Sequence, residues 1–194
     1  MNDDFNLFRK GHRETLRVQL DWHTTREGVI PAFKTSAEYI IERCATAKHH
    51  PDSFFWPIGC LYRQYLELHL KVLIELGRKI QRPGRDDAWA NGHFLDELWK
   101  EAKEHIMELL PHRCGVETEG VGQVVDAVDR MDRTGQELRY LRTKGGQDSL
   151  KNAPNEIWLD SFEEVMDSVF KLFSDWSDQL TQIEKSRIAC GPRS

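Results

Sequence analysis

Apolar residues in this 194-residue chain recur mostly every three or four positions, which places them on one side of an α-helix. Proline, glycine or polar loops interrupt the pattern and separate the helical stretches. The pattern predicts helices over 31–48, 54–82, 94–110, 119–142 and 161–185. We therefore expect an all-α helical bundle of about five helices, formed by residues 31–185.

The two ends of the chain have a weaker pattern. Leu16, Val18 and Leu20 alternate with polar residues as in a strand, but no second convincing strand exists to pair with them. We expect residues 1–30 to be an N-terminal extension, helical or irregular. Residues 186–194 are expected to form a flexible tail, because chain ends fray unless they are tied down.

The predicted last helix has the most regular apolar spacing. Ser161 followed by Glu164 matches a capping box, which satisfies free N–H groups at a helix start. Apolar residues then repeat at alternating steps of four and three, at Phe162, Met166, Val169, Phe173, Trp176, Leu180 and Ile183. This spacing is typical of a helix–helix seam, and it fits a seam within one bundle and a seam between two copies equally well.

The predicted second helix, 54–82, has an apolar stripe and a polar arc. At about 100° per residue, Tyr62 and Tyr65 fall on the stripe, and His69 falls inside it. The opposite arc holds Arg63, Gln64, Glu67, Lys71 and Glu75. About 120° therefore separate Arg63 from His69, so their side chains should diverge. We expect His69 to be a buried histidine with a hydrogen-bond partner.

Composition and charge exclude several classes of protein. No apolar stretch is long enough to span a bilayer, and the first residues lack the features of a secretory signal, so we expect a cytoplasmic protein. The net charge of −5 argues against a surface built to coat nucleic acid. Four scattered cysteines indicate neither a disulfide framework nor a metal site. No phosphate-binding, dinucleotide or zinc-protease motif is present, so no cofactor is expected.

Three blocks of the sequence resemble the HEPN superfamily, helical bundles common in bacterial toxin-antitoxin and antiphage systems. LYRQYLELHLKVLI (61–74) resembles the family's long helix, GHFLDELW (92–99) the turn that begins the next helix, and DRTGQELRY (132–140) a later conserved segment. The matching positions are Glu67, Lys71, His93, Leu95, Arg139 and Tyr140. Phe94 replaces the family's usual acid, and Leu141 stands where a proline is expected.

The family's ribonucleases use an arginine followed by a histidine five to seven positions later, near the last helices. This chain has no histidine after His112, so the motif is missing at the matching position. RQYLELH (63–69) has the spacing elsewhere, but chance alone gives about two such pairs in this composition. The chain holds four of them, Arg17–His23, Arg43–His49, Arg43–His50 and Arg63–His69.

The resemblance implies a non-catalytic HEPN-like binding module that recognises RNA, a nucleotide or a partner protein. A homodimer in a bacterial defence or stress-response system is expected. The ligand-binding site should gather Arg63, Glu67, Lys71, His93, Arg139 and Tyr140. Two alternatives stay open: a ribonuclease in which Arg63 and His69 meet across a dimer, and a structural adaptor that dimerises through the last helix.

The same polar residues also have a structural interpretation. A polar arc on a central helix must be paired, so Glu67, Lys71 and Arg139 would form buried salt bridges. His93 would act as a cap or a hydrogen-bonding hook at the start of the third helix. Neither interpretation requires a metal, and no metal site is expected.

Overall fold

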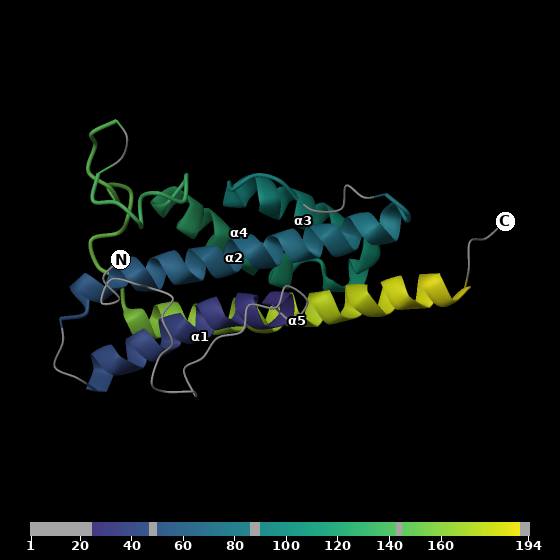
Figure 1. Cartoon of the computed structure of the whole chain (residues 1–194), viewed down its shortest axis with the longest axis horizontal. Coiled ribbons are helices and arrows are strands. Elements are labelled where there is room, and N and C mark those ends of the chain that lie inside the picture. Colours follow the sequence, from purple (N-terminus) through teal and green to yellow (C-terminus); the bar gives the residue numbers. More distant parts are fainter. Residues whose placement is uncertain (1–24, 47–49, 86–89, 143–144, 191–194) are drawn as a thin grey trace, which may run out of the picture.

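The computed structural model describes residues 25–46, 50–85, 90–142 and 145–190, and the all-α bundle predicted from the sequence is confirmed. Five α-helices lie within the described residues (Figure 1). They are α1 (Thr25–Thr46), α2 (Asp52–Gln81), α3 (Leu95–Leu109), α4 (Val116–Met131) and α5 (Leu159–Cys190), with a short 3₁₀ turn, η3, at Pro111–Arg113. No helix in this part of the chain combines the length and apolar character needed to cross a membrane.

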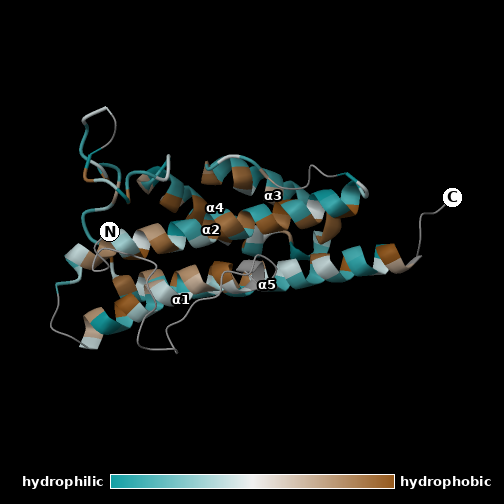
Figure 2. Ribbon diagram, viewed as in Figure 1, coloured by the Kyte–Doolittle hydropathy of each residue, from teal (hydrophilic) through white to brown (hydrophobic). Residues whose placement is uncertain are grey.

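Helix α2 is the centre of the bundle, with α1 and α5 on one side and α3 and α4 on the other (Figure 1). Helices α2 and α5 run parallel, because Tyr62 packs edge-on against Phe162 near their starts and the Ile80 carbonyl accepts a hydrogen bond from Arg187 near their ends. Hydrophobic and hydrophilic residues are interspersed along the helices (Figure 2), and amphipathic helices bury their hydrophobic residues against one another.

The apolar seam of the last helix lies within the chain. Its central residues, Met166, Val169, Phe173, Trp176 and Leu180, are at most 3% exposed and belong to the main core. The Trp176 ring stacks on Trp99 of α3, with ring centroids 6.2 Å apart. The seam is therefore used for bundle packing, one of the two possibilities that its spacing left open.

Helices α2 and α3 agree with the predicted ranges to within two residues at each end, whereas α1 does not. The expected start at residue 31 is wrong, because α1 begins at Thr25 and holds Pro31 in its interior. Ile30, in the added turn, is only 8% exposed and packs in the core, which favours helix before the proline. Residues 1–24 of the expected extension lie outside the described residues.

The expected fourth helix over 119–142 is wrong at its end, since α4 stops at Met131. Leu138 lies seven positions after Met131, the spacing expected if the helix continued, and it is buried. Its side chain nevertheless reaches Gly59 of α2 from a turn. The chain leaves the helix because the Asp132 carbonyl accepts a hydrogen bond from Arg63 and Gly135 has a φ of +74°.

The last helix is longer than expected at both ends. It begins at Leu159, so Ser161 lies inside the helix and does not form the expected capping box. Its carboxyl end continues through residues 186–190, where the sequence suggested a flexible tail. Arg187 donates a 2.6 Å hydrogen bond to the Ile80 carbonyl, which ties this end of α5 to α2. Residues 191–194 lie outside the described part.

Candidate functional site

A buried arginine forms the base of the candidate site. Arg63 on α2 is 2% exposed, and its guanidinium group contacts three segments. It donates to the Glu67 carboxylate at 2.9 Å, to the His93 carbonyl at 2.7 Å and to the Asp132 carbonyl at 3.1 Å. This single side chain therefore joins α2 to the turn before α3 and to the turn after α4, since planar guanidinium groups offer several donors in a fixed geometry.

Glu67 lies one turn further along α2 and accepts three hydrogen bonds. Besides Arg63, its donors are the Lys71 ammonium group at 2.9 Å and the His93 ring nitrogen Nδ1 at 2.7 Å. Burial alone would raise the pKa of Glu67, but the hydrogen bonds from Lys71, His93 and Arg63 outweigh it and hold that pKa below its ordinary value. Glu67 is therefore an ionised carboxylate with compensating charge on both sides.

The ionised Glu67 fixes the orientation of the His93 ring. A carboxylate can only accept hydrogen bonds, so Nδ1 of His93 must carry the proton and donate it. The ring itself stays accessible, since the His93 side chain is 72% exposed. The opposite nitrogen, Nε2, is therefore the atom that His93 can offer to a ligand. The predicted role as a hydrogen-bonding hook fits this contact with Glu67.

Arg139 and Tyr140 lie on the surface. Arg139 donates to the Gln64 side chain at 3.3 Å, and Tyr140 is 59% exposed. Gln64 and Glu67 are three residues apart on α2, so their side chains are neighbours on one helix face. Arg139, which contacts Gln64, and His93, which contacts Glu67, therefore lie over adjacent positions of the same helix.

A carboxyl pair anchors the turn that carries Arg139. Asp132 is 1% exposed, accepts the Glu137 backbone N–H at 3.0 Å and lies 3.4 Å from the Arg63 guanidinium. Burial raises the pKa of Asp132 to about 6, and the adjacent Glu137 carboxyl adds to the rise. Burial acts against ionisation of Glu137 as well, but hydrogen bonds from Asp132 and Thr134 lower its pKa to about 2.

Another cation and an aromatic ring lie next to His93. The Arg133 guanidinium is 4.9 Å from the centre of the Phe94 ring and forms ion pairs with Asp96 and Asp129. Asp129 also accepts the Leu95 backbone N–H at 3.1 Å, so it supplies the cap at the start of α3. Phe94 is 38% exposed, which leaves part of its ring on the surface.

The predicted site residues thus separate into two layers. Arg63, Glu67 and Lys71 are buried and paired with one another, and His93 joins them through Glu67. Arg139 and Tyr140 are exposed and take no part in the ion pairs that Arg63, Glu67, Lys71 and His93 form. The expected buried salt bridge is thus present for Glu67 and Lys71, whereas for Arg139 it is wrong, because its side chain lies on the surface above Gln64.

The sequence did not point to Asp132 and Glu137, or to the contact between Phe94 and Arg133. Their side chains meet because the chain leaves α4 and turns, and helical periodicity carries no signal for this turn. One signal was available: Gly135, inside the matched block 132–140, because glycine is favoured in turns. A glycine at this position indicates that the helix ends close to residue 135.

His69 has a different environment from Arg63. Its ring packs against Tyr65 and Phe173, and Nε2 lies 3.0 Å from the Ser177 hydroxyl. Burial lowers the pKa of His69 to about 4, although a hydrogen bond with the Phe173 backbone acts in the opposite direction. Within one chain, Arg63 and His69 contact different neighbours on different sides of α2, as their angular separation predicts.

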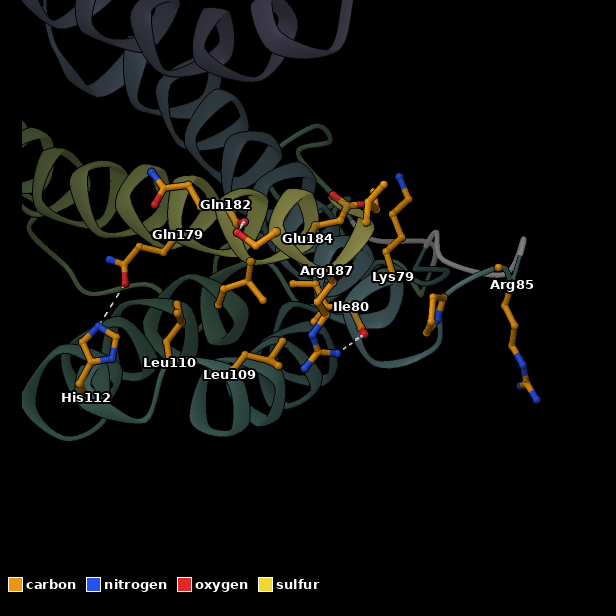
Figure 3. Close-up of a pocket in the computed structure, with 15 residues that line it drawn as sticks. Lys79, Ile80, Arg85, Leu109, Leu110, His112, Gln179, Gln182, Glu184 and Arg187 are labelled. Atoms are coloured by element: carbon orange, nitrogen blue, oxygen red, sulfur yellow. Dashed lines mark hydrogen bonds between the residues drawn. The ribbon is translucent and has the colours of Figure 1, made fainter. Parts of the chain in front are cut away.

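A separate pocket lies at the other end of the bundle. It has a volume of about 1200 Å³ and lies between the ends of α2, α3 and α5 (Figure 3). His112 and Gln179 form a hydrogen bond across one side of it, and Arg187 reaches Ile80 on another (Figure 3). None of the predicted site residues lines this pocket. Ile80 is 13 positions from Glu67, or about 20 Å along α2.

Comparisons of the chain with protein families, with curated proteins and with solved structures find no match. Among the described residues, no three histidine, cysteine, aspartate or glutamate side chains gather closely enough to hold a metal ion. The described side chains of the site offer guanidinium and ammonium groups, carboxylates, an imidazole and aromatic rings.

Proposed function

We propose that this chain is a non-catalytic, HEPN-like binding module that recognises single-stranded RNA. The observation that carries the proposal is that Glu67 holds the exposed ring of His93 in one orientation, while Gln64, on the neighbouring turn of α2, accepts a hydrogen bond from exposed Arg139. The buried ion pairs beneath supply rigidity, since Arg63 joins the segments that carry both exposed residues.

Each exposed group fits a different part of a ribonucleotide. The Arg139 guanidinium can hold a phosphate through charge-assisted hydrogen bonds. The Tyr140 ring, 59% exposed, offers a face on which a base can stack. Nε2 of His93 can exchange a hydrogen bond with a ribose hydroxyl or a phosphate oxygen. One guanidinium group and one aromatic ring suit contact with a short stretch of a single RNA strand. Such a small basic site is consistent with a protein whose net charge is −5.

The geometry gives no support to the ribonuclease alternative. A general base must reach the proton that it removes, but His69 is 9% exposed and hydrogen-bonded to Ser177. Arg63 is 2% exposed, and its donors are engaged.

From the resemblance to the HEPN superfamily, we propose that the module works as a homodimer in a bacterial defence or stress-response system. Sedimentation at rising protein concentration tests the homodimer.

The binding test uses fluorescence anisotropy with a short, labelled, single-stranded RNA. His93→Ala, Arg139→Gln and Tyr140→Ala should each weaken binding about tenfold, because a stacked base or a charged contact contributes roughly 1–3 kcal/mol. Matched controls change the same residue types elsewhere on the surface: His112→Ala, Arg85→Gln and Tyr39→Ala, all exposed. These controls should bind as the wild type does.

Two outcomes would contradict the proposal. In the first, the three site variants bind RNA no more weakly than their controls. In the second, the RNA recovered from the wild-type sample is cleaved and His69→Gln prevents the cleavage without unfolding the protein. The second outcome would establish the ribonuclease alternative.

A further inference from the structure

The pocket at the far end of the bundle has an apolar wall to which three helices contribute. Its apolar lining residues are Ile80, Pro83, Leu109, Leu110, Ile183 and Ile188. Ile80 and Leu110 are each 2% exposed and belong to the main core, whereas Ile188, in the last turn of α5, is 73% exposed. The wall therefore continues the core of the bundle out to the surface. The volume of about 1200 Å³ exceeds the roughly 300–1000 Å³ usual for small-molecule pockets, so it is sufficient for a small molecule.

Positive charge predominates among the charged side chains of the pocket. Lys79, Arg85 and Arg187 line it, together with one carboxylate, Glu184. The Lys79 ammonium group is compensated by the Glu75 carboxylate at 2.7 Å. Within the described part of the chain, neither Arg85 nor Arg187 forms an ion pair with a carboxylate. This excess of positive charge is local, because the whole chain has a net charge of −5.

Arg187 is the cation that lies at the apolar wall. Its Nη1 atom donates a 2.6 Å hydrogen bond to the Ile80 carbonyl, which holds the guanidinium group beside the end of α2 (Figure 3). Arg85 points away from the pocket in the same view (Figure 3). A guanidinium group has five N–H donors in a planar fork, so Arg187 can offer further donors to a ligand. This fork matches the two oxygens of a carboxylate.

The side of the pocket opposite Arg187 is closed by a pair of polar side chains. His112 and Gln179 form a 3.1 Å hydrogen bond with each other. Leu109 and Leu110 lie between this pair and Arg187 in the close-up view (Figure 3). The pocket therefore presents one guanidinium group at the edge of an apolar surface. A ligand that complements both features has an apolar chain and a single acidic group.

We propose that this pocket binds a free single-chain carboxylate, with its acid group on Arg187 and its apolar chain along Leu109, Leu110 and Ile183. The carboxylate accepts charge-assisted hydrogen bonds from the guanidinium fork, and the chain leaves water for the apolar wall. A chain with a cationic head meets Arg187 with like charge and binds more weakly. This site is additional to the proposed RNA site, since none of the residues of that site lines the pocket.

Isothermal titration calorimetry of the full chain with dodecanoate, below its micellar concentration, tests the proposal. Dodecanoate should bind about tenfold more tightly than dodecyltrimethylammonium, whose alkyl chain has a similar length. Arg187→Met keeps an unbranched apolar side chain but removes the guanidinium group, so it should weaken dodecanoate binding about tenfold. Ile188→Asp adds a carboxylate at the exposed edge of the wall and should also weaken this binding.

Arg43→Met and Val165→Asp are the matched controls. Arg43 is exposed in the last turn of α1, Val165 is 44% exposed on α5, and neither lines the pocket. Both variants should bind dodecanoate as the wild type does. Circular dichroism checks that each variant is folded, and Ile188→Asp decides the result if Arg187→Met unfolds. The proposal is overturned if the wild type does not bind dodecanoate, if it binds both head groups equally, or if a folded Arg187→Met or Ile188→Asp binds dodecanoate as tightly as the wild type.

Discussion

Gly135 is the residue on which the turn beneath the proposed binding surface depends. Its φ of +74° is unfavourable for any other residue, and a Cβ there would lie 2.9 Å from a nitrogen of the Arg63 guanidinium. Gly135→Ala should lower the free energy of unfolding by about 2–3 kcal/mol. The alanine would strain the backbone, and its Cβ would press against the buried Arg63 side chain, whose donors are all engaged. Urea unfolding measures the loss.

Gly146→Ala separates the two contributions. Gly146 has nearly the same φ, +76°, but a Cβ there would meet nothing within 4 Å. We expect a loss of about 1 kcal/mol, from backbone strain alone. Equal losses in the two alanine variants would show that the contact with Arg63 does not contribute.

His69 should make stability depend on pH. Its pKa is lowered to about 4 in the folded chain, against an ordinary value of 6.5, so protonation favours the unfolded state. The stability that depends on a neutral His69 is fully present above pH 6.5, and it is lost as the pH falls toward 4. His69→Gln cannot take up this proton, so its free energy of unfolding should fall less than that of the wild type between pH 7 and pH 4.5.

Exposed His50 provides the control, since His50→Gln should behave as the wild type does. The comparison of variants is needed because Asp132, with its raised pKa, acts in the opposite direction over nearly the same range. The same acid dependence in His69→Gln and in the wild type would exclude a buried, neutral His69.

Local spacing explains which residue contacts were predictable. Arg63, Glu67 and Lys71 follow one another at intervals of four, so a helix is sufficient to bring them together. The 120° between Arg63 and His69 also follows from helix geometry alone. The Asp132–Glu137 contact depends on a turn and on burial by α2, and no periodic pattern along the chain specifies either of them.

At the scale of elements, α2 and α3 approach closely at Gly77. A Cβ at this position would lie 2.3 Å from the ring of His105, which is buried on α3. Gly77→Ala should therefore cost about 2–4 kcal/mol, because the buried ring has to move or the helices have to separate. Thermal and urea unfolding measure the change.

Gly120 is the matched position in α4, where an added Cβ meets nothing within 4 Å. Gly120→Ala should stabilise the protein by about 0.5–1 kcal/mol, because alanine loses less backbone entropy than glycine in a helix. Stabilisation by both substitutions would contradict the close α2–α3 approach.

The helical elements were predictable where periodicity and breakers agreed. Both ends of α2 and α3 lie within two residues of their expected positions. The end of α4 was not predictable, because Leu138 continues the helical spacing although it is buried from a turn. The extension of α5 depends on a contact distant in sequence, between Arg187 and Ile80, which local propensity does not show.

In the whole molecule, the long central helix determines where the proposed binding surface lies. Turns from two distant parts of the sequence, at His93 and at residues 132–140, meet over Arg63 and place exposed groups next to each other. The sequence resemblance indicated these segments, but only the fold separates the buried pairs from the exposed residues. The pocket at the far end of α2 is lined by none of these residues.

The most direct test of this account is the affinity of the full chain for a labelled single-stranded RNA, measured over a range of salt concentrations. The wild type should bind less tightly as salt rises, because contact with phosphates releases counterions. Arg139→Gln combined with Tyr140→Ala should bind far more weakly and with a shallower salt dependence. If this double variant keeps both the affinity and the salt dependence of the wild type, the surface over Arg63 is not the RNA-binding site.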